Sequence, residues 1–390
     1  MKEIITTEKI PIKLWLDDME SGALQQARNL ANLPFAFSHI AIMPDSHQGF
    51  GMPIGGVLAT KGHIIPNAVG VDIGCGMCAR RTNLDRIDRK QLERIIAEIR
   101  KLVPVGFQWH KSSQNADLMP NITSKAKMPV VSREYGKALK QIGTLGGGNH
   151  FIEVQSGSDG YLWIMVHSGS RNIGKQVAEH YNRIAIDLNR RSSSGIPKAW
   201  QLAFLPLDSA EAESYLLEMR YCVDFARRNR ALMMTNIKRV FSDVMGIGID
   251  DYGEMIDIFH NFAAMERHFD TEVAVHRKGA TQARQGQPGI IPGSQGAKSY
   301  IVRGRGNPES FESCSHGAGR KMGRKQAIRE LSVKTETAGL NNKGIIHSIT
   351  TAKDLDEAPG AYKDIGTVME NQQDLVEIVV ELHPLAVIKG

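Results

Sequence analysis

The sequence predicts an α+β fold in which a single large domain of mixed sheets with flanking helices covers residues 1–390. Three observations support this prediction. Helix-like and strand-like segments are mixed along the whole chain. Glycine-flanked polar motifs recur from about residue 40 to the C-terminus, with no repeat, low-complexity tract or linker between them. The composition, 42% hydrophobic and 23% charged residues, is that of a globular protein with a sizeable core.

Bulk properties exclude several classes of protein. No apolar run reaches the length of a membrane span, so no membrane partner is expected. The N-terminus lacks the apolar core of a signal peptide, which favours the cytoplasm. Four cysteines in 390 residues do not suggest a disulfide scaffold. The net charge of +6 is compatible with a polyanionic partner.

The scaffold elements follow from apolar periodicity and from helix-ending residues. The segment 84–103 shows the clearest helical stripe, with Asp85 or Asp88 as its cap and Pro104 at its end. Further helices are expected at 20–32, 132–142, 175–189, 211–245, 255–269 and 362–372. Strands are expected at 40–43, 69–73, 151–154, 162–166, 273–276, 289–291, 299–302, and as a pair in 375–388 broken at Pro384. The polar segments 106–129 and 190–205 are expected to form surface loops.

The first two chemical motifs follow predicted strands. Asp45 comes directly after the strand 40–43, in a glycine-rich loop. The alternative to a functional role is that Asp45 only stabilises a turn. Asp72 and Cys75 lie three residues apart among glycines, and a carboxylate with a thiolate can hold soft or borderline divalent metals. Cys75 and Cys78 also form a C-x-x-C pair. A redox dithiol is disfavoured because no thioredoxin-like βαβ unit surrounds it, and a zinc knuckle lacks a second cysteine pair.

Two more histidines lie beside glycine-rich strand ends. The loop GTLGGGNHF brings His150 to the start of a strand, and it lacks the Lys-Ser/Thr of a P-loop. His167 ends the strand 162–166, and Arg171 belongs to a small polar cup after it. A lone histidine at a strand end is more often structural than functional. His260 falls in the segment 255–269, which is predicted to be helical.

His316 lies in the motif Ser-His-Gly-Ala-Gly-Arg, where glycines let a ligand approach the backbone. Cations follow at once, beginning with Arg320, and would neutralise an anion beside the ring. The motif therefore suits a nucleophilic or acid-base histidine for phosphate chemistry, and its alternative is an incidental histidine in a surface loop. From Arg277 to Lys325 only Glu309 and Glu312 are acidic. This basic region suits a phosphate backbone or nucleotide, or is simply a solvated positive face.

The candidate site is thus a mixed carboxylate, thiolate and imidazole set: Asp72, Cys75, His150, His167, His260 and His316. Such ligands suit Mn²⁺, Fe²⁺, Co²⁺ or Zn²⁺, whereas a thiolate does not favour Mg²⁺ or Ca²⁺. Two metals that share ligands would fit phosphoryl chemistry.

Eight segments in order resemble the RtcB family of RNA ligases: MPDSHQGFGMPIGG, VGVDIGCGM, GTLGGGNHFIE, HSGSR-x-IG, IIPGSQGAKSYIVRG, SHGAGR, AYKDI and the terminal VIKG. The resemblance implies an RtcB-type fold and an enzyme that uses GTP and two Mn²⁺ ions. It implies joining of RNA with a 2′,3′-cyclic phosphate or 3′-phosphate end to RNA with a 5′-hydroxyl end. Both tRNA splicing and RNA repair are compatible with this activity.

The resemblance also implies residue roles. His316 would take GMP onto its ring nitrogen, and Asp45 would orient that ring. Cys75 would bridge the two metals, with Asp72 and His260 completing one and His150 and His167 the other. The guanylate pocket would comprise Asn149, Phe151, Glu153, Ser294, Ser299, Ala318, Gly319, Tyr362 and Lys389. Arg171 and Arg320 are expected to contact RNA or phosphate.

Two other functions compete with the ligase. A metal-dependent cyclic phosphodiesterase or phosphatase would need the metal ligands but neither His316 nor the guanylate pocket. A non-catalytic RNA-binding protein would lack some of the six candidate residues, and none is missing. Cys78 is interpreted as a bystander beside the metal loop. The segments 106–129 and 190–205 lie outside the motifs and are expected to influence RNA preference.

Overall fold

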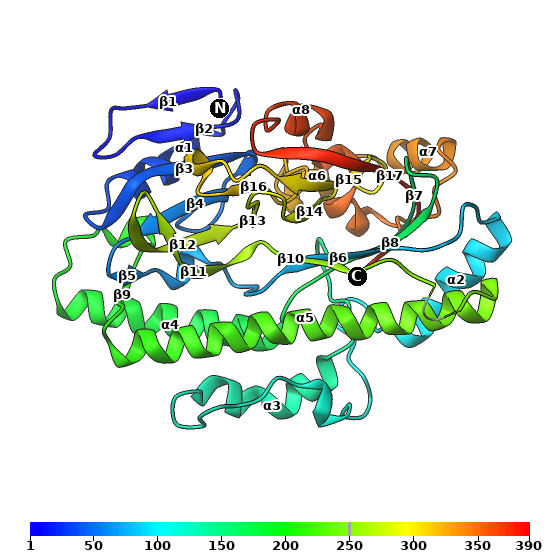
Figure 1. Ribbon diagram of the computed structural model, residues 1–390, viewed down its shortest axis with the longest axis horizontal. Helices are drawn as coiled ribbons and strands as arrows, with labels where there is room; N and C mark the ends of the chain where they lie inside the picture. Colours follow the sequence, from blue (N-terminus) through cyan, green and yellow to red (C-terminus); the bar gives the residue numbers. More distant parts are fainter. Residues whose placement is uncertain (249–250) are drawn as a thin grey trace.

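A computed structural model describes residues 1–248 and 251–390. Two large sheets, drawn in Figure 1, form the body of the molecule. The first has the strand order β1 (Glu3–Ile5), β2 (Ile12–Leu14), β3 (Ala36–His47), β4 (Ile54–Thr60), β12 (Thr271–Lys278), β11 (Asn261–His268). The second has the order β10 (Ile256–Phe259), β6 (Gly76–Arg81), β8 (Leu162–Ser168), β7 (Phe151–Gly157), β17 (Val376–Lys389), β15 (Ser299–Gly304), β14 (Pro288–Ile291).

Two short ribbons complete the strands: β13 (Ala280–Gln282) with β16 (Ser313–Ser315), and β5 (His63–Ile64) with β9 (Leu205–Pro206). The helices are α1 (Ser21–Ala31), α2 (Arg89–Leu102), α3 (Pro129–Gln141), α4 (Arg171–Arg191), α5 (Ala210–Met245), α6 (Arg324–Glu330), α7 (Val333–Asn342) and α8 (Ile365–Glu370). β2 and β3 pair in parallel, whereas the strands of the second sheet pair antiparallel to their neighbours. The predicted α+β class with mixed sheets and flanking helices is confirmed.

Helices α3, α4 and α5 lie on one side of the sheets. Figure 1 shows α5 running beneath the sheets, with α4 beside it and α3 below both, whereas α8 lies at the top. The 36 residues of α5 begin at the Ser209 cap, whose hydroxyl accepts from the backbone N–H of Ala212. Cys222 is buried on this helix, in an apolar cluster that also contains Tyr215 and Phe225. The predicted helix 211–245 is correct.

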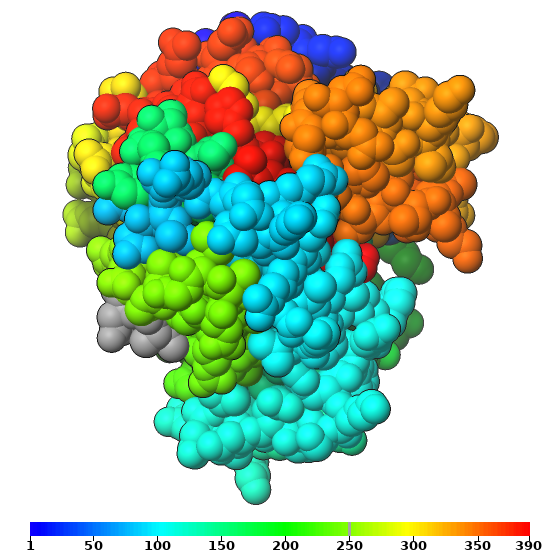
Figure 2. Space-filling view, turned by 90° about the vertical axis from the view of Figure 1, so that its right-hand side faces the viewer, coloured from blue at the N-terminus to red at the C-terminus, as the bar shows by residue number. Residues whose placement is uncertain are grey.

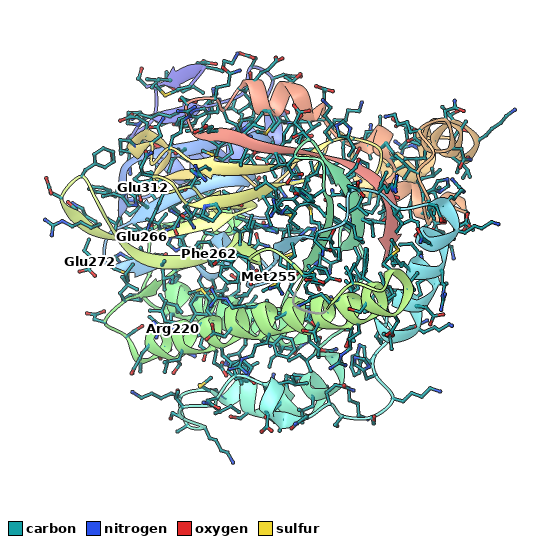
Figure 3. The ribbon with its side chains drawn as sticks, turned by 45° about the vertical axis from the view of Figure 1, so that its right-hand side comes forward. Arg220, Met255, Phe262, Glu266, Glu272 and Glu312 are labelled. Atoms are coloured by element: carbon teal, nitrogen blue, oxygen red, sulfur yellow. The ribbon has the colours of Figure 1, made fainter. Side chains whose placement is uncertain are left out.

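The segment 255–269 is the largest error of the sequence prediction. It forms two strands, β10 and β11, and His260 lies in the bend between them. Helix-forming residues such as Ala264 and Met265 suggested a helix, but pairing of β10 with β6 and of β11 with β12 overrides that local preference. Glu266 lies on the buried side of β11, so the apolar alternation of a strand is not visible in the sequence. Figure 3 shows Phe262 and Glu266 along this edge strand, above Arg220 of α5.

Two predicted strand ends also differ in the structure. The segment 69–73 is not a strand: a 3₁₀ turn at Pro66–Ala68 is followed by bends and turns that lead into β6. Val69 and Ile73 are buried because the turn packs inside the molecule rather than because it joins a sheet, whereas Val71 is 56% exposed. The strand predicted at 40–43 continues through Pro44 to His47, with an irregular register to β4 after Ile42. Because the pairing is irregular there, the strand does not need a hydrogen bond from Pro44, which has no backbone N–H.

The remaining differences are at element boundaries. α2 begins at Arg89 because Asp88 and Gln91 form a capping box, and α3 begins at Pro129 rather than at Ser132. α4 is longer than predicted at both ends, and α8 is confined to Ile365–Glu370. The segment predicted as a strand pair is the single strand β17, whose register to β7 shifts between Pro384 and Ala386. The segment 332–344 holds α7, which together with α6 forms the orange lobe in Figure 2.

Within the described residues, no helix has the length and apolar character that a membrane crossing requires. The strand ends that matter for the site converge between the two large sheets. β6 follows Cys75, β8 contains His167, and β16 ends directly before His316. The backbone N–H of His260 donates to the carbonyl of Cys75 at 2.9 Å, which ties the bend after β10 to the start of β6.

Candidate active site

A cavity of about 640 Å³, here called the central cavity, lies among the ends of strands from both sheets. Its wall includes the ends of β3 and β12 from the first sheet and of β7, β8 and β17 from the second. Five of the six candidates line it directly: Asp72, Cys75, His167, His260 and His316. His150 lies just behind the wall, with its Nε2 atom 3.1 Å from Asp72 Oδ2. The structure therefore brings all six residues together.

Cys75 lies at the centre of this group. Its Sγ atom is 3.4 Å from His150 Nε2 and 3.4 Å from His167 Nε2. His167 Nε2 is in turn 3.4 Å from His260 Nε2. The donor atoms form two triplets that share Cys75, one with Asp72 and His150 and the other with His167 and His260. A shared thiolate between two triplets is the arrangement that could bridge two ions.

The pairing of the remaining ligands differs from the expected one. Asp72 was expected beside His260, and His150 beside His167, but the triplets place Asp72 with His150 and His167 with His260. Strand geometry explains the difference. His167 on β8 pairs in register with Met77 of β6, and the bend holding His260 is bonded to Cys75 at the start of the same strand. The order of motifs in the chain does not contain this information.

Backbone contacts fix which imidazole nitrogen is free in two of these histidines. The Nδ1 atom of His150 donates to the carbonyl of Leu145 at 3.0 Å, and that of His167 donates to the carbonyl of Asn149 at 3.1 Å. Each Nε2 atom therefore carries the lone pair of its ring and lies 3.4 Å from Cys75 Sγ, and that of His150 is also 3.1 Å from Asp72 Oδ2. An outer partner on Nδ1 is the usual companion of a histidine that binds a metal through Nε2.

The protonation tendencies of the group fit a bound cation. Burial, followed by the charge of Asp72, raises the pKa of the Cys75 thiol well above its usual value. Burial lowers the pKa of His167 and of His260 well below the ordinary value for histidine, so both rings are neutral at pH 7. Neutral imidazoles and a thiol that ionises only beside positive charge form a donor set suited to a borderline divalent metal.

His316 faces the cavity, and one of its two ring nitrogens already forms a hydrogen bond. Its Nδ1 atom donates to Asp45 Oδ2 at 2.5 Å, and its backbone N–H donates to the same oxygen at 3.0 Å. Asp45 is completely buried, and the backbone N–H of Gly317 also donates to its Oδ2 at 3.3 Å. The carboxylate thus fixes both the ring and the loop. The Nε2 atom is left with a lone pair, as a nucleophile requires.

Gly319 makes this arrangement possible. Its φ of 71° lies in the left-handed region, and a Cβ atom there would stand 2.1 Å from the Asp45 carbonyl oxygen. No other residue could hold the loop this close to Asp45. The glycine that the sequence suggested for ligand approach therefore serves to seat His316 on its carboxylate.

The predicted guanylate residues gather at one end of the central cavity. Eight of the nine line it: Asn149, Phe151, Glu153, Ser294, Ala318, Gly319, Tyr362 and Lys389. Ser299 is the exception. It is buried, and its hydroxyl accepts from the backbone N–H of Gly293, so it supports the loop that carries Ser294. Their role in nucleotide binding stays a prediction.

At this end Glu357, which was not predicted from the sequence, pairs with the positively charged side chains. Its carboxylate accepts from the Tyr362 hydroxyl and pairs with Arg320 at 3.1 Å and with Lys389 at 3.6 Å. Burial raises the pKa of Glu357, but Lys389 and the two arginines Arg324 and Arg320 together bring it below its usual value. No motif singled out Glu357, and its position five residues before Tyr362 was the only signal.

A second buried carboxylate at this end behaves differently. Burial raises the pKa of Glu153 to about 8, partly offset by Lys389 and by the hydrogen bond from Gln155. Glu153 is therefore largely protonated at pH 7, so it can donate as well as accept a hydrogen bond to a base edge.

The two arginines expected to contact phosphate are placed differently. Arg320 lines the central cavity, but Glu357 and the Asp356 carbonyl occupy its guanidinium. Arg171 begins α4 behind His150, and its Nη1 atom is 3.4 Å from His150 Nδ1. Arg171 does not line the central cavity in the described part of the chain.

Cys78 and the two loops lie apart from the candidate ligands. Cys78 is buried on β6 in an apolar cluster with Leu92 and Ile95 of α2, and it does not contribute to either triplet among the described residues. This placement agrees with the interpretation of Cys78 as a bystander. The segment 106–129 contains one short 3₁₀ helix, and 190–205 runs from the end of α4 to β9.

Comparisons with known proteins bear on the same residues. The sequence profile of the family described as "tRNA-splicing ligase RtcB" matches residues 26–137 and 119–390. RNA-splicing ligase RtcB1 of Escherichia coli strain ATCC 25922 is 40% identical over 412 residues, covering 100% of this chain and 99% of the relative. RNA-splicing ligase RtcB of E. coli strain K12 is 39% identical with the same coverage. tRNA-splicing ligase RtcB of Thermococcus kodakarensis is 30% identical, covering 98% of this chain and 95% of the relative.

These matches extend over the whole chain and include every segment that builds the central cavity. The predicted resemblance and the RtcB-type fold are therefore confirmed, and the chain belongs to the RtcB family of splicing ligases.

Proposed function

We propose that this chain is a GTP- and Mn²⁺-dependent RNA ligase. It would join RNA ending in a 2′,3′-cyclic phosphate or 3′-phosphate to RNA beginning with a 5′-hydroxyl. The observation that carries this proposal is the state of His316. Its Nδ1 atom is held by Asp45 at 2.5 Å, and its ring lines a cavity shared with two metal-like triplets. The names of the relatives support RNA as the substrate.

The first step is guanylylation of the histidine. The Nε2 lone pair of His316 attacks the α-phosphorus of GTP, an N–P bond forms, and pyrophosphate leaves. Asp45 stabilises the positive charge that develops on the ring because it accepts from Nδ1–H throughout. Lys389, held by Glu357 at the guanylate end, offsets negative charge on the nucleotide.

The RNA steps follow in order. Water opens the cyclic phosphate to a 3′-phosphate. An oxygen of that 3′-phosphate attacks the phosphorus of the His316-bound GMP, and the P–N bond breaks to restore the free imidazole. The 5′-hydroxyl oxygen of the second RNA then attacks the activated 3′-phosphorus, and GMP leaves with the bond electrons. This sequence accounts for both the nucleophilic histidine and the guanylate wall.

Asp72, Cys75, His150, His167 and His260 are the residues that would hold two Mn²⁺ ions. When bound, such ions supply Lewis-acid neutralisation of the phosphates. The protein contributes the positions of the donors, through Leu145 and Asn149 carbonyls on the outer imidazole nitrogens.

A joining assay tests the proposal. The protein is incubated with GTP, Mn²⁺, an RNA with a 2′,3′-cyclic phosphate and a labelled RNA with a 5′-hydroxyl. A longer labelled product is expected, and it should disappear without GTP. Opening of the cyclic phosphate without joining, in the presence of GTP, would contradict ligation and indicate a metal-dependent phosphodiesterase.

A further inference from the structure

Part of the wall of the central cavity contains none of the predicted guanylate residues. This part, here called the Phe50 arm, consists of His47, Gln48, Phe50, Asn67 and Lys278. It lies beside the reacting group. Gly279, next to Lys278, comes so near the His316 ring that a Cβ atom added to it would lie 3.3 Å from His316 Cε1. A ligand in the Phe50 arm therefore adjoins the proposed nucleophile.

A further cavity adjoins the Phe50 arm. This side cavity has a volume of about 520 Å³ and shares Phe50 and Asn67 with the central cavity. Its other walls come from the end of α4 and from the loop that follows it, including Arg190 and Lys198. The segment 190–205, which no motif covers, thus forms part of the wall of a cavity next to the one that His316 lines.

Charge in the side cavity favours an anion. The described residues that line the side cavity include the cations Arg190 and Lys198 but no carboxylate. Arg190 forms an ion pair with Asp187 at 3.2 Å, whereas Lys198 forms no ion pair in the described part of the chain. Amide side chains supply most other polar groups of the wall: Asn67, Asn182, Asn189 and Gln201. Asn67 and Asn189 already donate to the backbone carbonyls of Gln201 and Phe204, so Asn182 and Gln201 are the amides that we expect to donate to phosphate or to base edges.

Lys278 supplies a cation in the Phe50 arm. Its Nζ atom donates to the carbonyls of Phe50 at 2.6 Å and Asn67 at 3.0 Å. An ammonium has three donors, so one remains for a ligand. No carboxylate among the described residues forms an ion pair with this side chain, and burial lowers the pKa of Lys278 to about 7. A phosphate bound beside Lys278 would favour the charged ammonium, because a nearby negative charge stabilises the protonated form.

Phe50 stands at the junction of the two cavities with its side chain in solvent. Phe50 is 70% exposed, although its backbone is held by the hydrogen bond from Lys278 Nζ to its carbonyl. The neighbouring Gly51 has a φ of 68°, and a Cβ atom there would stand 2.6 Å from the Gln201 carbonyl oxygen. The loop is thus packed tightly while the ring remains free. An exposed aromatic ring on a fixed backbone is a platform on which an unpaired base can stack.

We propose that the Phe50 arm and the side cavity bind the single-stranded RNA that carries the 3′-phosphate, with a base stacked on Phe50 and backbone phosphates near Lys278 and Lys198. The inference rests on the proposed function, because it assigns one substrate strand to a site beside His316. The 3′-phosphate strand is favoured because it must reach His316-bound GMP before the second strand is needed.

The test isolates the first RNA step. Protein already carrying GMP is mixed with an oligonucleotide ending in a 3′-phosphate, without any 5′-hydroxyl strand, and transfer of GMP to the RNA is followed in a single turnover. Phe50→Ala should raise the RNA concentration needed for half-saturation by roughly 5- to 100-fold, as loss of one base–aromatic stack predicts. Phe50→Tyr keeps the ring and should behave as wild type. Phe269→Ala is the matched control, because Phe269 is 47% exposed and lines neither cavity.

Salt dependence tests the side cavity independently. Lys198 is exposed, so Lys198→Ala leaves the core intact. Loss of one phosphate contact should lower the slope of log affinity against log salt by about 0.7, the value for one contact on a single strand. An unchanged slope would remove Lys198 from the binding site.

The outcomes separate the possible errors. Wild-type affinity of Phe50→Ala for the 3′-phosphate strand overturns the assignment. If Phe50→Ala instead raises only the amount of 5′-hydroxyl strand needed for joining, the site belongs to the other strand and the assignment is also wrong. If wild-type protein takes up GMP but never passes it to RNA, the proposed ligase function fails first.

Discussion

At the scale of single residues, the site depends on carboxylates that fix imidazoles. Asp45 Oδ2 accepts three hydrogen bonds, from His316 Nδ1 and from the backbone N–H groups of His316 and Gly317. Asp45→Asn preserves the shape but removes the charge. We expect the rate of His316 guanylylation to fall by about 10³-fold or more, the order typical when a histidine loses its orienting carboxylate. Label uptake from GTP measures this rate, and a wild-type rate in Asp45→Asn would show that Asp45 does not assist the ring.

Cysteine substitutions test the proposed metal centre with a control three residues away. Cys75→Ser should weaken Mn²⁺ binding by more than about 100-fold, because even outer partners of metal ligands contribute 10- to 100-fold. Cys78→Ser places a hydroxyl in the apolar cluster and should cost about 1–3 kcal/mol of stability, with Mn²⁺ affinity unchanged. Equilibrium dialysis measures the affinity and urea unfolding the stability. Equal losses of Mn²⁺ affinity in the two variants would refute a specific role for Cys75.

The candidate residues could be predicted from the sequence because glycine-flanked motifs mark them individually. All six lie together, although their donor atoms group around Cys75 differently from the predicted ligand sets. Glu357 could not be predicted, since its importance comes from three cations that reach it from Arg320, Arg324 and Lys389. Such contacts depend on how distant segments pack, which no local motif encodes.

At the scale of elements, α5 anchors the strands that carry the site. Arg230 on this helix is fully buried, and it donates to Asp257 of β10 and to the carbonyls of Gly74 and Ser168. Arg230→Met should cost about 3–5 kcal/mol in the free energy of unfolding, because it leaves Asp257 buried without its partner. Urea unfolding measures the loss.

Arg227 provides the comparison for Arg230. It approaches the same carboxylate at 3.7 Å, but its side chain is 55% exposed. Arg227→Met should therefore cost less than about 1 kcal/mol, as for other solvent-exposed ion pairs. Similar losses in the two variants would mean that burial does not set the strength of the Asp257 interaction.

Element prediction succeeded where local signals are strong and failed where pairing decides. The long amphipathic helix α5 and the buried strands β7 and β8 match their predicted positions closely. The prediction for 255–269 failed because Glu266 and His268 lie on the buried side of β11, where Glu266 pairs with Arg277 and hydrogen-bonds with His268. A polar residue that is paired across strands looks, in the sequence, like the exposed face of a helix.

At the scale of the whole molecule, buried neutral histidines couple stability to pH. His276 is fully buried; its Nδ1 atom donates to the Leu58 carbonyl, and its Nε2 atom accepts from the Ile65 N–H. Burial lowers its pKa to about 4. Between the unfolded value of about 6.5 and the folded value of about 4, the unfolded chain binds the extra proton. Stability is therefore present above pH 6.5 and is lost as the pH falls toward 4.

Comparison with His276→Gln isolates this contribution. Glutamine can accept from Ile65 and donate to Leu58 but does not titrate. Between pH 7 and pH 5, wild type should lose about 2 kcal/mol more of unfolding free energy than the variant. Urea unfolding at the two pH values measures the difference. Parallel losses in both proteins would show that His276 is not the group that titrates.

The convergence of the two large sheets is the part of the fold that the sequence could not supply. Asp45, Lys278 and His316 come from the first sheet and the ribbon beside it, and Cys75, His167 and Lys389 from the second. Their meeting point follows from pairings over long separations, such as β17 with β7 and β12 with β4. The interpretation of residues 1–390 as one domain stays a prediction.

The most direct test of the central claim identifies the residue that carries GMP. The protein is incubated with Mn²⁺ and GTP labelled at the α-phosphate, denatured and digested, and the labelled peptide is sequenced alongside His316→Ala. A single acid-labile label on His316, absent from the variant, is the predicted result. A label that persists in His316→Ala, or no label in wild-type protein with Mn²⁺ bound, would contradict the guanylylated histidine on which the proposed mechanism depends.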